Sequence, residues 1–306
     1  MQTGAVIVTY NPQLSDLEIL VTNIMTTVKM VVLVDNGSKN IEEIKGFAGR
    51  FPNARVILLG ENKGIGYAQN RGIEMVFADP AIQGVVLFDH DSHPEPDMIT
   101  VLSSEYERLT AAGVKVGALG PVYIDPRTQN HYPISVFAGF SLKKFYPTEG
   151  NNDPIPATFI IASGSLIPRA TFETVGGMNE SYFIDYIDIE WGFRAKKFGF
   201  DLYACPAAKM FHQVGDSRLK IFGREISMHS PLRRYYLARN SIFMLKTGYI
   251  DWRYKVREFF YSISRVVVFV AAVDKKTTYL KYIFRGWYDG LAGNFGPCKI
   301  VERNKG

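Results

Sequence analysis

The chain has 306 residues, of which 47% are hydrophobic and 21% are charged. This composition is typical of a globular protein and excludes a collagen-like or largely disordered chain. The two cysteines, Cys205 and Cys298, are too few for a disulfide framework or a four-cysteine zinc site. The first residues form an apolar, strand-like run rather than a signal peptide, so we expect a cytoplasmic protein.

The net charge of +5 is distributed unevenly along the chain. Residues 230–306 carry a balance of +10, whereas residues 1–229 carry −5. A basic segment of this kind favours a phosphorylated ligand, a nucleic acid or an acidic membrane surface. Its most apolar stretch, Val256–Val273, contains three charged residues and is too polar to span a membrane. We expect there either a helix packed against the body or an interfacial helix.

Apolar β-branched runs and helical spacing alternate through the first third of the chain. Strands are predicted at residues 4–9, 30–34, 55–59 and 84–88, with helices at 13–28 and 67–77. Alternating strands and helices indicate an α/β fold with a Rossmann-like, mostly parallel central sheet flanked by helices. Further along, we expect strands near 116–119 and 159–167, a loop over 146–156, and a helix from Asp188 that ends before Gly199.

A polar cluster follows each of the first four predicted strands. The clusters are Thr9-Tyr10-Asn11, Asp35-Asn36-Gly37-Ser38, Asn62-Lys63-Gly64 and Asp89-His90-Asp91. Ligands of doubly wound sheets bind outside the carboxyl ends of the strands. The four clusters therefore predict one shared crevice.

Asp89 and Asp91 end the fourth strand with two carboxylates at i and i+2. Such a pair can hold a divalent ion against a phosphate, and carboxylate oxygens suit Mg²⁺ or Mn²⁺. The alternative is a solvated turn. We do not expect zinc, because no further ligands stand at the usual spacing.

The segment Gly64–Gly72 resembles a dinucleotide-binding fingerprint, but Gln69 occupies the place of the third glycine. A nicotinamide enzyme is therefore not expected. The segment is interpreted either as a loop that approaches a substrate or as a plain tight turn.

Taken in order, these motifs resemble those of inverting family 2 glycosyltransferases of the GT-A fold. The resemblance runs from about residue 4 to 245 and continues through Ser163-Gly164-Ser165, Gly176-Gly177-Met-Asn-Glu and Phe183-Ile-Asp-Tyr-Ile-Asp-Ile-Glu-Trp-Gly-Phe-Arg194. Within the family, the chain is most similar to bacterial rhamnosyltransferases that use dTDP-L-rhamnose. The resemblance implies a catalytic domain over 1–229, with a nucleotide-sugar half to about 115 and an acceptor half from about 116. A basic, mainly helical extension would follow over 230–306.

The resemblance also implies roles for individual residues. Asp188 takes the place of the catalytic base, although Ile187 stands where many relatives have Glu, and Asp185 is a second carboxylate that could act instead. Asp188 would otherwise be a helix N-cap. The residues implied to bind the donor are Thr9, Tyr10, Asn11, Asp35, Asn62, Gly64, Asn70, Asp89 and Arg239. Asp91, Asp89 and His212 are implied to hold the cofactor, Mg²⁺ or Mn²⁺.

The expected reaction transfers L-rhamnose from dTDP-L-rhamnose to an acceptor hydroxyl of a bacterial surface polysaccharide or lipid-linked glycan, with inversion. We expect peripheral attachment to an anionic membrane, on the inner face of the cell membrane, and no nucleic-acid partner; a homo-oligomer stays open. Two alternatives also stay open. One is a family 2 transferase with another nucleotide sugar, and the other is a non-catalytic basic module that docks on membrane or nucleic acid.

Overall fold

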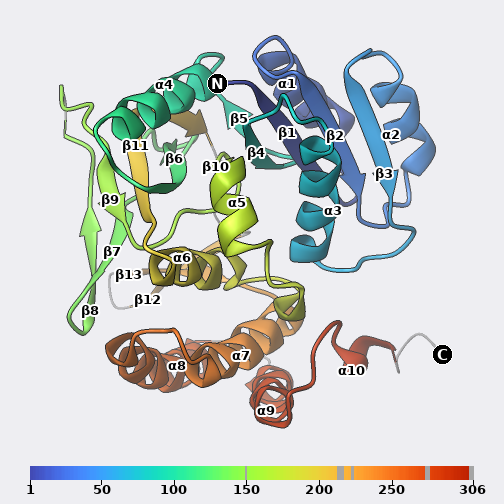
Figure 1. The fold of residues 1–306 in the computed structure, drawn as a ribbon. Helices are drawn as coiled ribbons and strands as arrows, with labels where there is room; N and C mark the ends of the chain where they lie inside the picture. Colours follow the sequence, from blue (N-terminus) through green and yellow to red (C-terminus); the bar gives the residue numbers. More distant parts are fainter. Residues whose placement is uncertain (149, 212–216, 222–223, 273–275, 303–306) are drawn as a thin grey trace.

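The structure is a computed structural model that describes residues 1–306 apart from 149, 212–216, 222–223, 273–275 and 303–306. Its centre is a nine-stranded sheet with the order β3-β2-β1-β4-β10-β6-β11-β5, in which β9 also pairs with β11 (Figure 1). These strands are β1 (Thr3–Thr9), β2 (Met30–Asp35), β3 (Ala54–Leu58), β4 (Gly84–Asp89), β5 (His93–Pro94), β6 (Val116–Ile124), β9 (Ile155–Ala157), β10 (Leu166–Pro168) and β11 (Asp201–Phe211).

The sheet is mostly parallel, as predicted. Strands β1 to β4 pair in parallel, and so do β6 and β11. The short strands β5, β9 and β10 run antiparallel to their neighbours. The carboxyl ends of β1, β2 and β4 consequently lie side by side.

Helices cover both faces of the sheet, which explains why the central strands β1, β2 and β4 are almost entirely apolar and buried. Successive strand residues point to opposite faces, so Val6 and Val8 pack with one core cluster while Ala5 and Ile7 pack with another. Residues of α3 (Ile65–Phe77), α5 (Arg169–Val175) and α6 (Ile187–Lys197) belong to the first cluster. Residues of α1 (Leu14–Ile24), α2 (Ile41–Ala48) and α4 (Met98–Ala111) belong to the second.

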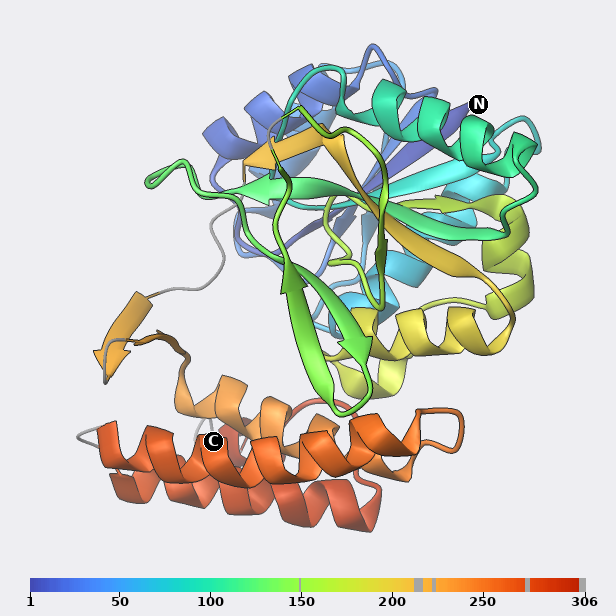
Figure 2. The same cartoon turned by 90° about the vertical axis from the view of Figure 1, so that its left-hand side faces the viewer.

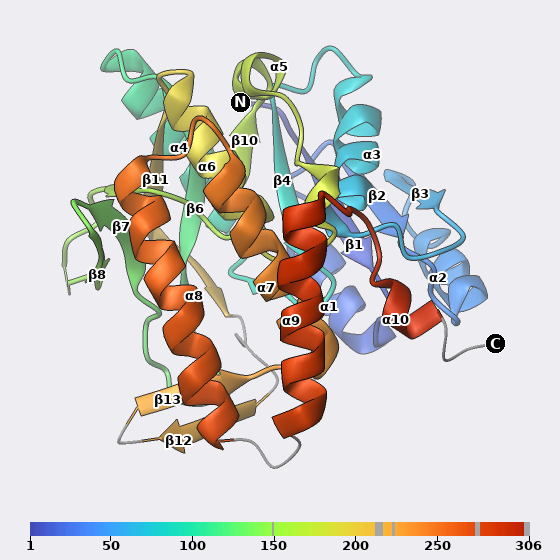
Figure 3. The same ribbon diagram turned by 90° about the horizontal axis from the view of Figure 1, so that it is seen from below.

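The last part of the chain forms a helical layer at the end of the molecule opposite α4 (Figure 1 and Figure 2). It consists of α7 (Pro231–Lys246), α8 (Trp252–Ala272), α9 (Lys276–Ala292) and α10 (Lys299–Glu302). Seen from below, α8 and α9 lie on either side of α7 (Figure 3). The expected helical extension is therefore present.

Several elements differ from the prediction. The strand expected over 159–167 is confined to Leu166–Pro168, and β9 begins inside the loop expected over 146–156. Helix α2 and the 3₁₀ turn η1 (Glu180–Tyr182) were not predicted. Two antiparallel hairpins were also not predicted: β7 (Ile134–Ala138) with β8 (Ser141–Phe145), and β12 (Ser217–Ile221) with β13 (Arg224–Met228).

Candidate active site

The loops after β1, β2 and β3 are joined to one another by side-chain hydrogen bonds. The Thr9 hydroxyl donates to the Asp35 carboxylate at 3.2 Å, and the Asn36 amide donates to Asn62 Oδ1 at 3.1 Å. Asn62 Oδ1 also accepts from the Gly64 backbone N–H at 3.0 Å. Between β1 and β2, the Asn11 N–H donates to the hydroxyl of Ser38. These bonds hold the ends of three separate strands as one surface.

A cavity of about 620 Å³ opens at this surface, a size that suits a small organic ligand. One wall comes from the strand ends, with Tyr10, Asn36, Asn62, Gly64, Asp89 and Asp91. A second comes from the middle of the chain, with Ser163, Asp185 and Asp188. The third comes from α7 and α8, with Arg233, Tyr254, Arg257, Glu258, Tyr261 and Arg265. Three distant parts of the sequence thus enclose one space.

Asp89 and Asp91 lie where β4 ends, and both line the cavity. The Asp89 N–H donates to Ser163 Oγ at 3.0 Å, and Ser163 Oγ lies 2.6 Å from Ser92 Oγ. This turn is therefore tied to the segment before β10. Among the residues that the structure describes, no group of three or more metal-type side chains lies together. Two carboxylates suit an ion that keeps water ligands and takes the remainder from a substrate phosphate, as Mg²⁺ does.

Asp188 is the second residue of α6, whose N-cap is Tyr186, so Asp188 does not cap the helix. Its Oδ1 accepts a hydrogen bond from the N–H of Ile189 at 2.9 Å. Burial raises the pKa of the Asp188 carboxyl to about 6, and the negative charges of Asp185 and Asp89 add to the rise. A carboxylate with a pKa near neutrality is a better proton acceptor than an ordinary surface aspartate.

Asp185 lies on the same wall but is ion-paired. Both Nε and Nη2 of Arg233 donate to its carboxylate, the closest approach being 3.0 Å. The backbone at Phe183, Asp185 and Tyr186 has positive φ values of 66°, 62° and 66°. Such conformations persist only where neighbouring structure imposes them.

Helices α7 and α8 supply that structure. The Asn240 side-chain amide donates to the carbonyls of Tyr182, Ile184 and Asp185, at 2.9, 2.7 and 3.1 Å. From α8, Glu258 accepts a hydrogen bond from the Tyr186 hydroxyl. We call residues 183–186 the catalytic loop, because they lead directly into Asp188.

Arg265 completes the connection between α8 and the catalytic loop. Its Nη2 donates to Glu258 Oε1 and to the Tyr186 hydroxyl, each at 2.7 Å. Burial raises the pKa of Tyr186, so the phenol stays protonated and can donate to Glu258.

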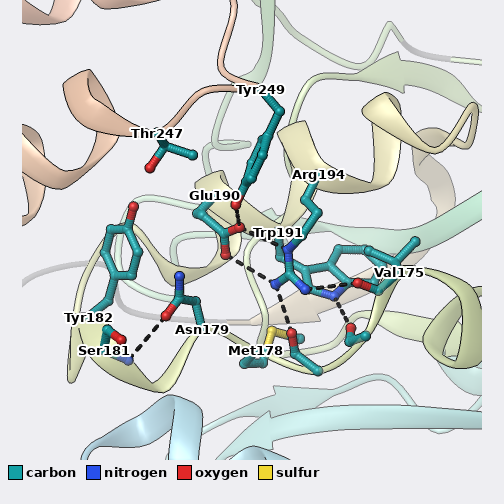
Figure 4. Close-up of polar contacts among 12 residues, drawn as sticks. Val175, Met178, Asn179, Ser181, Tyr182, Glu190, Trp191, Arg194, Thr247 and Tyr249 are labelled. Carbon is teal, nitrogen blue, oxygen red and sulfur yellow. Dashed lines mark hydrogen bonds and ion pairs between the residues drawn. The ribbon is translucent and has the colours of Figure 1, made fainter.

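A buried ion pair between Glu190 and Arg194 fixes the middle of α6 (Figure 4). Glu190 has no exposed surface and accepts hydrogen bonds from Arg194 Nε at 2.8 Å and from the Tyr249 hydroxyl. Arg194 also donates to the carbonyls of Val175 and Gly177. The helix that carries Asp188 is therefore anchored to the Gly176-Gly177 turn.

The structure places most of the residues implied for the donor at or beside this cavity. Tyr10, Asn62, Gly64 and Asp89 line it. Thr9 and Asp35 are fully buried, and Asn11 joins the loops behind them. His212, implied as a metal ligand, lies outside the described residues.

Two of the residues implied for the donor, Asn70 and Arg239, make contacts away from the cavity. The Asn70 amide group donates to the Met178 carbonyl and accepts from its N–H, at 2.9 and 2.7 Å. Arg239 has no exposed surface, and its Nη2 donates to the Tyr182 carbonyl at 2.8 Å. Neither residue lines the cavity, because both use their polar groups on backbone far away in the sequence.

Two features of the cavity were not predicted. The side of α8 with Tyr254, Glu258 and Arg265 faces it, and the i, i+4, i+11 spacing of these residues would have placed them on one helix face. Gln69 also lines the cavity while only 3% exposed, and its Oε1 has no hydrogen-bond partner among the described residues.

Solved structures share this architecture. *S. aureus* TarS 1-349 in complex with UDP-GlcNAc superposes with a TM-score of 0.57, at 13% identity, over 96% of this chain and 80% of that chain. Mannosyltransferase PcManGT from Pyrobaculum calidifontis, in complex with GDP-Man and Mn²⁺, gives a TM-score of 0.56 at 14% identity, over 96% and 88% of the two chains. The chain therefore has the GT-A fold of these glycosyltransferases.

Sequence comparison gives the family. The chain belongs to glycosyl transferase family 2, because the sequence model of that family matches residues 5–176. It is 35% identical over 293 residues to dTDP-rhamnosyl transferase RfbF of Shigella flexneri, and this alignment covers 95% of this chain and 96% of the relative. It is 28% identical over 232 residues to N-acetylglucosaminyl-diphospho-decaprenol L-rhamnosyltransferase of Mycobacterium tuberculosis, over 68% of this chain and 74% of that protein.

Proposed function

We propose that the protein transfers L-rhamnose from dTDP-L-rhamnose to an acceptor hydroxyl with inversion of configuration. The observation that carries the proposal is that Asp89, Asp91 and Asp188 line one cavity at the carboxyl edge of the sheet. The choice of donor is supported by the full-length similarity to a dTDP-rhamnosyl transferase.

Asp188 acts as the general base. Its carboxylate takes the proton of the acceptor hydroxyl while that oxygen forms a bond to the anomeric carbon. The bond from the anomeric carbon to the diphosphate oxygen breaks on the opposite side, so a single displacement inverts the configuration. General-base assistance of this kind contributes about 10²–10⁴-fold to a rate.

Asp89 and Asp91 would hold Mg²⁺ or Mn²⁺, which when bound neutralises charge on the departing diphosphate. Arg257 also lines the cavity, and its guanidinium lies 3.6 Å from the nearest Glu258 oxygen. Gln69 provides a buried amide oxygen, Oε1, without a hydrogen-bond partner among the described residues, and a ligand hydroxyl could donate to it.

The acceptor proposed here is a lipid-linked glycan or surface polysaccharide at the inner face of a bacterial cell membrane. One relative is named for a lipid diphosphate acceptor, which supports this class. We retain residues 1–229 as the proposed catalytic domain and 230–306 as its extension. The oligomeric state stays an open prediction.

A panel of sugar nucleotides tests the donor. Unfolding temperature and product formation are measured with dTDP-L-rhamnose, dTDP-glucose, UDP-GlcNAc and GDP-mannose, each with Mg²⁺, Mn²⁺ or chelator. We expect dTDP-L-rhamnose to stabilise the protein most and to be consumed, because a ligand that binds only the native state raises its stability. If only a different sugar nucleotide stabilised the protein, the proposed donor would be that sugar nucleotide and not dTDP-L-rhamnose.

The Asp91→Ala variant tests the cation. We expect it to fold, since Asp91 is exposed, and to lose most of its activity and its response to added Mg²⁺ or Mn²⁺. Asp97→Ala, which removes another exposed carboxylate outside the cavity, is the matched control. Full activity of Asp91→Ala in chelator would refute a cation at this position.

A further inference from the structure

Helix α8 exposes a continuous apolar stripe. Its members are Trp252, Val256, Phe259, Phe260, Ile263 and Val267, which are 60%, 38%, 49%, 65%, 42% and 65% exposed. Counted from Val256, the later members follow at three, four, seven and eleven residues, and Trp252 precedes it by four. This spacing places all of them on one face of the helix. A surface helix of a globular protein normally directs this kind of face inward.

The opposite side of α8 is polar and faces the protein. Tyr254 and Glu258 are 3% and 2% exposed, and Glu258 holds the catalytic loop through Tyr186. With Arg265, they line the cavity. The side of α8 that faces the protein therefore brings ionised groups to the active site, while its apolar stripe faces solvent.

Helix α9 lies across α7 from α8 (Figure 3) and carries a second exposed apolar stripe. Phe284, Tyr288 and Leu291 are 57%, 61% and 66% exposed, at spacings of four and three residues. We call the two stripes together the α8–α9 face.

The exposed charges of α8 and α9 have a single sign in the part of the chain that the structure describes. Both carboxylates, Glu258 and Asp289, are buried at 2% and 3% exposure and are paired with arginines. Arg253, Lys276 and Lys281 are exposed. The α8–α9 face therefore combines apolar side chains with cations.

We propose that the α8–α9 face docks on an anionic lipid bilayer. Apolar and basic side chains on one surface match the acyl boundary and the negative headgroups of such a bilayer. A second copy of this chain fits less well, because pairing two such faces would oppose cations to cations. No helix in the described residues is long and apolar enough to cross the bilayer, so the proposed contact lies in the plane of the interface.

Docking in this orientation extends the proposed function, because it would bring the enzyme to a lipid-linked acceptor. This role for docking rests on the proposed function. One side of α8 would touch lipid while the other lines the active site, and a helix with its side chains is about 10–12 Å across. A lipid-linked acceptor held in the bilayer would therefore reach the cavity by passing α8.

Vesicle co-sedimentation of the full chain tests the docking. Vesicles that contain phosphatidylglycerol are compared with vesicles of phosphatidylcholine alone, over a salt series. We expect tighter binding to the anionic vesicles, weakened by salt, because the attraction is screened over about 8 Å at physiological ionic strength. Tryptophan fluorescence should shift to shorter wavelength on binding, since Trp252, one of the three tryptophans, lies on the face and is 60% exposed.

The double variant Phe260→Glu with Val267→Glu should lower the affinity for anionic vesicles at least about tenfold. Neither residue lines the cavity, and both are 65% exposed. Phe198→Glu, at a position 51% exposed and outside α8 and α9, is the matched control and should bind as the unaltered chain does. Arg253→Glu with Lys281→Glu tests the electrostatic part without touching an apolar residue.

The proposal is overturned if the double variant binds anionic vesicles as well as the unaltered chain does. It is also overturned if light scattering shows a dimer that this variant abolishes while vesicles do not bind. Transfer to a soluble, lipid-free acceptor separates the two proposals. Activity on that acceptor without vesicle binding would reject docking alone, whereas vesicle binding without turnover of any sugar nucleotide would reject the proposed reaction alone.

Discussion

Asp188 and Asp185 stand three residues apart, yet their carboxylates have different surroundings. Asp185 is held by Arg233 at 3.0 Å, so its oxygens already accept hydrogen bonds from a cation. Asp188 lines the cavity, and its side chain accepts a hydrogen bond from the N–H of Ile189. The geometry therefore favours Asp188 as the base and leaves Asp185 to help shape the loop.

We predict that Asp188→Asn binds donor normally but loses turnover by about 10²–10⁴-fold. The amide keeps the shape of the carboxylate and cannot accept the proton. Donor affinity measured by calorimetry and kcat measured with saturating acceptor separate the two effects. Asp185→Asn is the matched control and should lose less, while the reverse order would assign the base to Asp185.

The raised pKa of Asp188 predicts an acidic limb in the pH profile of kcat. The base must be deprotonated, so kcat should be constant above its pKa of about 6 and fall about tenfold for each unit below it. Asp185→Asn removes a negative charge that raises this pKa, so the limb should move to lower pH. A limb that stays in place in this variant, or moves upward, would contradict the assignment.

At the scale of elements, Gly64 is the point where α3 meets the catalytic loop. Its φ is +92°, and a Cβ there would lie 2.7 Å from the Phe183 carbonyl oxygen. The Ile65 N–H donates to the same oxygen at 2.8 Å. Only glycine allows this approach, which explains the motif glycine in terms of packing as well as ligand access.

Gly64→Ala should destabilise the protein by about 3 kcal/mol, because it adds a backbone clash to an unfavourable φ. Gly60→Ala is the matched control, since its φ is +76° but no atom lies within 4 Å of the added Cβ. It should cost only about 1 kcal/mol. Denaturant unfolding of both variants measures the difference, and equal losses would show that crowding at Phe183 contributes nothing.

Helix α8 supports the catalytic loop through Glu258, so a change there should act on both stability and rate. We predict that Glu258→Gln loses about 2 kcal/mol of stability, because the hydrogen bond from Tyr186 loses its charged acceptor and Arg265 loses its ion-pair partner. Its kcat should fall as the loop loosens. Phe259→Ser, at the neighbouring exposed position, should leave kcat on a soluble acceptor unchanged; an equal loss in both would indicate general damage to α8.

The elements that the sequence predicted best are those whose pattern is local. Strands β1, β2 and β4 are buried on both faces and appear as continuous apolar runs, and α6 begins and ends within one residue of expectation. Strand β8 was missed because its residues, Ser-Leu-Lys-Lys-Phe, are largely exposed and lack an apolar alternation. Helix α2 has only eight residues and gives a weak periodic signal.

The contacts that Asn70 and Arg239 make away from the cavity are with residues distant in sequence. Asn70 bonds to Met178, and Arg239 bonds to Tyr182, so nothing near either residue indicates its partner. The contribution of α8 to the cavity was not predicted for a different reason. The positive charge balance of residues 230–306 indicates a role for their exposed surface, whereas Glu258 and Arg265 contact the catalytic loop from the inward side of α8.

At the scale of the whole molecule, one core cluster connects the first strand with the last helices. It contains Val6 and Val8 of β1, Trp191 of α6, Phe243 of α7 and Tyr254 of α8. The division at residue 229 therefore does not interrupt the hydrophobic core. The cavity crosses the same division, because its walls come from both sides.

We accordingly predict that the chain unfolds in one cooperative transition rather than in two. Scanning calorimetry should give equal calorimetric and van't Hoff enthalpies. A donor at 100 times its Kd, with Mg²⁺, should add about 2.7 kcal/mol of stability and move the whole transition, since it contacts walls from both parts of the chain. Asp91→Ala provides the control, because it should show the same single transition with a smaller response to donor and cation. Two separate transitions, with only one of them shifted by the donor, would mean that residues 230–306 fold as a unit of their own and that the shared core contributes little to cooperativity.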